Sequence, residues 1–470
     1  MKQNNKFILA QLKKHHIDLS CYGLEIKAFR KIRERFGFIR VRKQGHTVES
    51  IRDAVVRIRV IYPNAGGREM VNLLFHEEEI LVSRSIVMQY FHEHESHLVR
   101  GRRHGHFKRK RFWAAGVNDM WAVDQHDKWK YKFGLALHTG IDPFIGYIHW
   151  IKIWWNNSNP RLILSYYLEA IETLECIPLV TQSDPGSENH RYMRQKKNVM
   201  PEITWSVLRR RFTPGFENIL DEGVTNGWYD PGVLLQALVC RWVFIPWLQA
   251  ELDTYRRRVN MTAKRRDRNK ILPHGVPQHM LEFPDEYAIL DFKIKVKQEH
   301  INTVRQQYAD PSHDIFQLVP PDFAQLIQSF YVDLGEPSIT RETCWEIYRQ
   351  LLRCFEHLDK VHNIDSSVDD MWGFALTQAE NEYRNEMQPL PNLRPLRGGE
   401  DIVGQDGGYY MGGVNGGNGL DDAQHAQLQR LIDEVEPNVA GETDFEGEDD
   451  ICAWFSDEEG PDELAAADEW

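Results

Sequence analysis

The chain has few cysteines and no paired ones. Its 470 residues include six cysteines, none of them in a Cys-x-x-Cys pair, so neither a disulfide framework nor a zinc ribbon is expected, and we expect buried, reduced thiols. Long apolar runs are also missing. The longest, 232–249, is interrupted by Arg241 and Pro246, whereas a membrane helix needs roughly 18 uncharged residues. The N-terminus lacks the pattern of a secretory signal. The sequence therefore predicts a protein inside the cell, with no membrane partner.

The rest of the composition is that of an ordinary folded protein. Hydrophobic residues make up 42% of the chain, aromatic residues 11% and charged residues 27%, values that exclude a collagen-like or wholly disordered protein. At roughly 150 residues per domain, the length predicts two to four domains.

The formal net charge of -12 conceals a strong asymmetry. Residues 401–470 carry twenty acidic residues and one basic residue, whereas residues 1–115 carry 24 basic and 11 acidic residues. A basic N-terminal third predicts a polyanionic partner, and DNA is the partner that we expect.

An N-terminal helical segment, 1–45, precedes a region expected to resemble a helix-turn-helix, 46–99. Turn residues separate a helix at 51–61 from a helix at 68–75, and Ser83 can cap a third helix. A recognition helix that begins there would bring Arg84 to a major groove of DNA. A plain helical hairpin is the alternative.

A basic linker follows at residues 100–116. Its cations, with Arg84 and two later arginines, are the predicted DNA contacts, because Lys and Arg neutralise phosphates. The set is Arg84, Arg102, Arg103, Lys108, Arg109, Lys110, Arg111, Arg209 and Arg210. Nuclear import signals use the same residue types, so the run also predicts a nuclear protein; a solvated linker is the alternative. Residues 256–258, three arginines, could also follow a DNA backbone, or form a solvated helix face.

After the linker the hydrophobic pattern becomes that of strands. Aromatic and β-branched runs at 121–124, 134–141 and 146–154 predict three strands, the last two forming a hairpin. A helical pattern then begins at Pro160 and continues to Leu174. The next strand, 179–184, is expected to lie parallel to the first because a helix connects them. The predicted fold class is therefore α/β, with a mixed sheet in the order β-β-β-α-β.

Asp124 and Asp184 each end one of these predicted strands. Parallel neighbouring strands would bring both carboxylates to one edge of the sheet, where the sites of α/β proteins lie. Adjacent carboxylates repel unless a divalent cation compensates them, and oxygen ligands suit Mg²⁺ or Mn²⁺. Two such ions would support phosphoryl transfer. Two unrelated strand-end acids are the alternative.

Three motifs carry a family resemblance. Residues 121–128 are Trp-Ala-Val-Asp-Gln-His-Asp-Lys, residues 139–142 are Thr-Gly-Ile-Asp, and residues 181–189 are Thr-Gln-Ser-Asp-Pro-Gly-Ser-Glu-Asn. Together they resemble the catalytic core of retroviral-type integrases and DDE transposases, most closely the integrase-core proteins of basidiomycete fungi. The resemblance covers about residues 45–260 and continues to about 355. It implies a ribonuclease H-like sheet, metal-dependent DNA strand cleavage and strand transfer, two Mg²⁺ or Mn²⁺ ions, and a homo-oligomer.

The resemblance also implies a third carboxylate, usually a Glu in a Glu-x-x-Trp helix. Glu202 and Trp205 match this pattern. Pro201 suits the first position of such a helix, and Trp205 would anchor it in the core. Glu217 and Glu222 are the alternatives for the third acid. The implied catalytic and metal-binding set is Asp124, Asp184 and Glu202.

The chain departs from the family pattern between the second and third acids. Related cores separate them by roughly 35 or more residues, room for a helix and a strand, whereas here seventeen residues lie between Asp184 and Glu202. The intervening segment is basic and has no apolar period. The catalytic core is expected to span residues 117–275. One α/β unit of this core is therefore predicted to be missing near residues 189–200. A true deletion and an error in the coding sequence would both produce this junction.

A helical C-terminal extension is expected at 276–360, followed by a linker at 361–397. Residues 398–419 include ten glycines, so residues 398–470 are predicted to form a disordered, Gly-rich and then acidic tail. Acidic and bulky apolar residues alternate at 449–459, a pattern typical of segments that bind a protein partner; a solubilising appendage is the alternative.

Together these features predict a mobile-element-derived integrase or transposase. Two alternatives remain open. One is a catalytically inactive DNA-binding protein that retains the fold, and the other is a protein-interaction scaffold that acts through its acidic tail.

Overall fold

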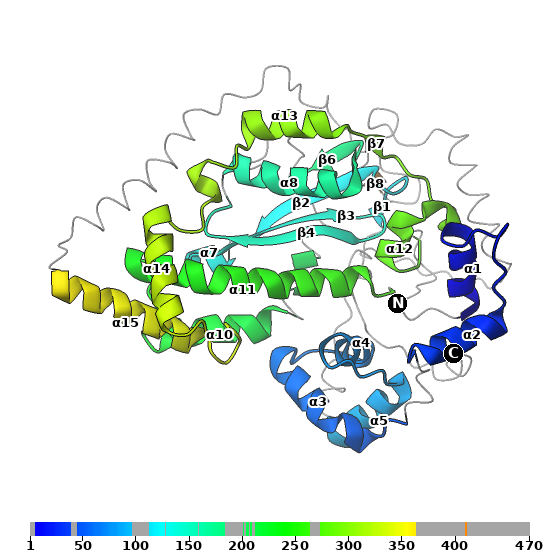
Figure 1. The fold of residues 1–470 in the computed structure, drawn as a ribbon, viewed down its shortest axis with the longest axis horizontal. Helices are drawn as coiled ribbons and strands as arrows, with labels where there is room; N and C mark the ends of the chain where they lie inside the picture. Colours follow the sequence, from blue (N-terminus) through cyan, green and yellow to red (C-terminus); the bar gives the residue numbers. More distant parts are fainter. Residues whose placement is uncertain are drawn as a thin grey trace. The chain divides into compact units, whose positions relative to one another are not determined.

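The computed structural model describes eleven ranges of the chain, and the following account is confined to them. They are residues 5–38, 45–95, 112–126, 128–157, 159–183, 201, 204–205, 207–208, 212–263, 273–362 and 409–410. The chain divides into two compact units. The described residues up to 95 belong to the first unit, and those from 112 to 410 belong to the second (Figure 1).

The N-terminal unit is helical in all of its described elements. These are α1 (Asn5–His15), α2 (Ile26–Arg35), α3 (Val48–Ile61), α4 (Gly67–Glu77) and α5 (Arg84–His94). Thr47 and Ser50 form a capping box at the start of α3, and the Ser83 hydroxyl accepts a hydrogen bond from the Ile86 N–H at 3.4 Å. The predicted third helix and its cap are confirmed, as are the two helices before it.

An ion pair joins α3 to the C-terminal end of α5. Arg59 of α3 binds the Glu95 carboxylate with Nε at 3.1 Å and Nη2 at 2.5 Å, and its Nη1 donates to the carbonyl of Ala65 at 2.8 Å. Both charged side chains are largely buried, where an unpaired charge would be costly. The two parallel hydrogen bonds give each charge a partner of opposite sign. One basic residue of α3 is therefore used for folding and not for a partner.

The second unit is built around a four-stranded mixed sheet. Its strands are β2 (Met120–His126), β3 (Ala136–Asp142), β4 (Tyr147–Trp154) and β6 (Val180–Gln182), in the order β4-β3-β2-β6. β3 is antiparallel to both neighbours, and β6 is parallel to β2. The predicted α/β class, the hairpin and the parallel fourth strand are confirmed.

Two helices flank this sheet in Figure 1. α8 (Pro160–Leu174) begins at the predicted proline, with Asn159 as its cap, and Glu169 of α8 pairs with Lys152 of β4 at 2.7 Å. α11 (Leu234–Asn260) runs along β4. All seven residues of β3 are buried, so the middle of the sheet is covered on both faces.

The remaining elements are α10 of the core, several short elements, and the helices of the C-terminal extension. They are β1 (Phe112–Trp113), α7 (Lys128–Phe133), β5 (Cys176–Ile177), α10 (Thr213–Thr225), α12 (Pro277–Glu282), η2 (Pro284–Tyr287), β7 (Ile294–Lys295), α13 (Gln298–Tyr308), η3 (Asp314–Phe316), α14 (Pro321–Asp333), α15 (Cys344–His362) and β8 (Tyr409–Tyr410). The predicted helical extension is confirmed. It packs on the core: β7 pairs with β5, and Arg305 of α13 pairs with Glu172 of α8 at 2.6 Å.

The described residues bear on two expectations from the amino-acid composition, one about membrane helices and one about cysteines. No helix among them is long and apolar enough to span a membrane. Five of the six cysteines are described, and all five are free. Cys176, Cys240 and Cys344 are buried, but Cys21 is exposed and Cys354 is half-buried, so the expectation of uniformly buried thiols was wrong.

Candidate active site at the end of strand β2

Asp124 lies where β2 passes from the core toward solvent. Residues 120–124 are buried, and Gln125 and His126 are half-buried. Asp124 itself is 9% exposed, and its register partner on β3 is Thr139. The alternation of a strand brings Asp124 and His126 to the same face of the sheet. The surrounding side chains can therefore fix the orientation of this carboxylate, and its position beside half-buried residues leaves it near the protein surface.

Trp205 is a hydrogen-bond partner of Asp124. The indole Nε1–H donates a hydrogen bond to Asp124 Oδ2 at 2.9 Å, and the indole is 5% exposed. The described residues between 201 and 208 have helical backbone and are all buried. The prediction that Trp205 anchors a helix in the core is confirmed. Its contact with the first predicted catalytic acid was not foreseen.

His126 completes this cluster. Its ring is stacked on the Trp205 indole, with centroids 5.2 Å apart and an angle of 21° between the planes. The sequence contained His126 in the Asp-x-His-x-Lys pattern but gave no reason to assign it a role. A pairing of residues 79 positions apart leaves no local period in the sequence.

The other predicted site residues fall into two groups. Glu217 and Glu222, the alternative third acids, lie on α10, half-buried and exposed respectively, and Arg84 is half-buried at the first position of α5. The rest lie outside the described residues: Asp184, Glu202, Arg102, Arg103, Lys108, Arg109, Lys110, Arg111, Arg209 and Arg210.

A divalent cation suits the donor found here. Asp124 offers hard carboxylate oxygen, the ligand type that Mg²⁺ and Mn²⁺ prefer. Carboxylates that bind metals are themselves commonly held by a hydrogen bond from a neighbouring side chain, and Trp205 supplies one. Among the described residues, no three His, Cys, Asp or Glu side chains gather in a way that could hold a metal; that set excludes Asp184 and Glu202.

Asp142, from the second family motif, has a structural environment. It is fully buried, and it accepts backbone N–H bonds from Asn118 at 2.8 Å, Phe144 at 2.9 Å and Ile145 at 3.4 Å. Burial outweighs these donors and raises the pKa of Asp142 to about 7. The side chain fixes the turn between β3 and β4 and lies apart from the Asp124 cluster.

Two buried histidines also belong to the core. His138 accepts a hydrogen bond at Nδ1 from the Trp150 indole at 2.9 Å, and His149 packs on Trp121 with ring centroids 3.9 Å apart. Burial lowers the pKa of each imidazole to about 3. Both rings are therefore neutral at physiological pH.

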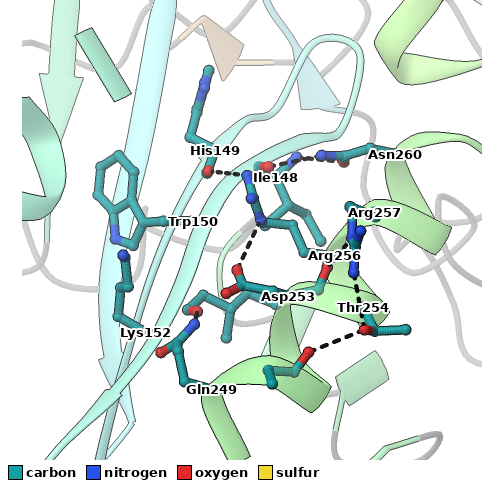
Figure 2. A network of polar contacts seen from close by, with 12 residues as sticks. Ile148, His149, Trp150, Lys152, Gln249, Asp253, Thr254, Arg256, Arg257 and Asn260 are labelled. Carbon is teal, nitrogen blue, oxygen red and sulfur yellow. Dashed lines mark hydrogen bonds and ion pairs between the residues drawn. The ribbon is translucent and has the colours of Figure 1, made fainter. Parts of the chain in front are cut away.

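The outer edge of the sheet is closed by side chains of α11 (Figure 2). Asn260 accepts from the Ile148 N–H at 2.9 Å and donates to the Ile148 carbonyl at 2.8 Å. Gln249 makes the same pair of contacts, with the Ile153 N–H and the Ile151 carbonyl, both at 3.0 Å.

Arg256 completes this edge by donating to the His149 carbonyl at 2.8 Å. Arg258 is 4% exposed, and of residues 256–258 only Arg257 is exposed. The sequence-based expectation that all three arginines could follow a DNA backbone was therefore wrong for Arg258, because the helix turns its side chain into the core.

No family model, curated protein or solved structure matches this chain.

Proposed function

We propose that this chain is an integrase- or transposase-like enzyme that cleaves and joins DNA strands with divalent metal ions, on a ribonuclease H-like core. The observation that carries the proposal is the 2.9 Å hydrogen bond from Trp205 to Asp124. It brings the Glu-x-x-Trp segment to the first strand of the core. A junction of only seventeen residues between Asp184 and Glu202 is thus long enough for that segment to reach the sheet.

The register of β2 and β6 supports the second acid. Met120 pairs with Val180, Trp121 with Thr181 and Ala122 with Gln182, so the paired residue numbers always differ by 60. Asp124 and Asp184 differ by the same number. Two further residues in this register would bring the two carboxylates side by side on one face, because side chains two residues apart share a face.

The third acid is better matched by Glu202 than by its alternatives. On a helix, residues three apart are neighbours, so a Glu three residues before Trp205 would lie close to the residue that contacts Asp124. The acids of α10 have other surroundings. Glu217 is half-buried and Glu222 is exposed, and neither has a described contact with Asp124 or Trp205.

In the proposed mechanism Asp124, Asp184 and Glu202 would hold Mg²⁺ or Mn²⁺. The bound ions would polarise the phosphodiester and activate the attacking oxygen. The protein's own task is to hold negative oxygens from separate parts of the chain at one position beside the DNA backbone. The acids act as ligands, so no covalent enzyme intermediate is expected.

The proposal includes the partners that such chemistry needs. The N-terminal unit would bind DNA as a helix-turn-helix, with Arg84 at the start of α5, whose N–H groups also favour a phosphate. The basic linker and Arg209 and Arg210 would contribute phosphate contacts. We further propose a nuclear homo-oligomer whose acidic tail binds a protein partner.

The test uses the purified full chain with labelled DNA ends and either Mg²⁺ or Mn²⁺. Wild type should nick and join the ends, and Asp124→Asn, Asp184→Asn and Glu202→Gln should each lose both activities. Glu217→Gln and Glu222→Gln are matched controls and should retain them. Equal activity in all six proteins would reject the three acids as catalytic.

The short junction favours one rival function, a DNA-binding protein that keeps the fold without catalysis. That rival predicts DNA binding that weakens steeply with salt and no strand cleavage with either metal. The same assay, run beside a binding titration at two salt concentrations, separates the two functions.

A further inference from the structure

We propose that Trp205 is a positioning residue for this site, a role that rests on the proposed function. Its indole N–H would fix Oδ2 of Asp124, and its ring face would fix the imidazole of His126. One side chain, that of Trp205, would then hold two side chains of β2 in the arrangement needed to bind metal and DNA.

The hydrogen bond has the geometry for this role. The Nε1 to Oδ2 distance of 2.9 Å is typical of a donor bound to a carboxylate. Trp205 is buried, and an indole has a single N–H, so the donor direction is set by packing. A buried donor that cannot rotate fixes the plane of the carboxylate, and so fixes the direction in which its oxygens face a cation.

The stack acts on the second side chain. His126 lies two residues beyond Asp124 on the same strand and face, is half-buried, and is stacked on the indole at 5.2 Å. Stacking on a ring that is already ordered restricts the rotamers of the imidazole without a further loss of entropy from the indole. His126 would then present a ring nitrogen to a phosphate oxygen of DNA bound beside Asp124.

Two substitutions separate the two contacts. Trp205→Phe keeps an aromatic face for His126 but removes the N–H, and Trp205→Leu removes both. Trp345→Phe is the matched control. Trp345 is 6% exposed, and its indole donates to the Ile219 carbonyl, so the change removes an equally buried N–H from a place without the predicted chemistry.

The first readout is Mn²⁺ affinity of the DNA-free full chain, followed by electron paramagnetic resonance. Loss of a hydrogen bond to a metal ligand typically weakens metal binding or activity by roughly 10- to 100-fold. Trp205→Phe should therefore weaken Mn²⁺ binding by at least roughly 10-fold, and Trp345→Phe should leave it unchanged. In strand-transfer kinetics, Trp205→Phe should lower kcat with little change in KM for DNA, whereas Trp205→Leu should also raise KM because His126 is released.

The second readout needs no active enzyme and no variant of Trp205 that folds well. In ¹H–¹⁵N spectra, the indole cross-peak that Trp205→Phe lacks should shift when Mg²⁺ is added to wild type and should not shift in Asp124→Asn. If Trp205→Phe does not fold, the peak can be identified as the indole signal whose position differs between metal-free wild type and Asp124→Asn, because that substitution changes the acceptor of the Trp205 N–H.

The outcomes separate this inference from the function beneath it. Wild-type Mn²⁺ affinity and kcat in Trp205→Phe, together with loss of both in Asp124→Asn, would overturn the positioning role and leave the function standing. Unchanged Mn²⁺ affinity and activity in Asp124→Asn would overturn the function itself.

Discussion

Side chains meet the central sheet in two contrasting ways, at the β4 edge and at the end of β2. At the β4 edge, Asn260, Gln249 and Arg256 bond to backbone groups (Figure 2). At the end of β2, Trp205 bonds to a side-chain carboxylate. A bond to the backbone closes an edge that could otherwise pair with another chain. A bond to a carboxylate orients an acid whose oxygens are of the type that binds hard cations. The first arrangement serves folding, and the second suits chemistry.

The largest effect is expected from breaking the closed edge at Asn260. Asn260→Leu leaves the N–H and the carbonyl of Ile148 without their partners in a buried setting, which should lower the free energy of unfolding by about 3 kcal/mol. Urea unfolding measures the loss. Asn302→Leu changes an exposed amide on α13 and should cost less than about 0.5 kcal/mol. Equal stability of the two variants would mean that α11 does not close the edge.

A second prediction concerns Asp142, the acid that fixes the turn between β3 and β4. Burial raises the pKa of Asp142 from 3.8 to about 7 in the folded protein. The folded chain then holds a proton that the unfolded chain releases, so the contribution of this group to stability is highest below pH 4 and declines as the pH rises toward 7. Between pH 5 and pH 7 the free energy of unfolding should fall by about 2 kcal/mol through this group.

The measurement is urea unfolding at several pH values for wild type and Asp142→Asn. The variant cannot ionise, so the wild-type decline should be steeper by that amount. Parallel curves for the two proteins would show that Asp142 is ionised throughout, as its three backbone donors alone would favour.

The smallest effect is expected at Gln249, where the groups are only partly buried. Gln249→Met keeps the length of the side chain and removes its bonds to Ile151 and Ile153, at a cost of about 1.5 kcal/mol in unfolding free energy. Strand-transfer activity should be unchanged, since this edge lies apart from the Asp124 cluster. A variant with normal stability and lost activity would contradict the division between the two regions.

The sequence predicted most of the sheet because its signals are local. Alternating apolar runs and Pro160 indicated β2, β3, β4, α8 and β6, and Ser83 indicated the start of α5. It could not predict that Asn260 and Gln249 bond to a strand about 100 residues earlier, because polar residues on a helix are usually solvated. Nor could it show that α11 continues through Pro246, where tertiary packing outweighs the lost hydrogen bond.

The candidate site was predicted in part. The strand-end motif indicated Asp124, and the Glu-x-x-Trp pattern indicated that Trp205 is buried in the core. The hydrogen bond between them joins residues 81 positions apart, so no local pattern in the sequence predicts it. The helix-turn-helix, the metal ions and the roles of Asp184 and Glu202 remain predictions, the last two because both residues lie outside the described ranges.

The most direct test of the account is to locate the cation on the chain. Fe²⁺ can replace Mg²⁺ at such sites, and with ascorbate and peroxide it cuts the polypeptide near where it is bound. The account predicts cuts close to residues 124, 184 and 202 that disappear with excess Mg²⁺ and in Asp124→Asn. Cuts confined to the acidic tail, or a pattern that Asp124→Asn does not change, would contradict it.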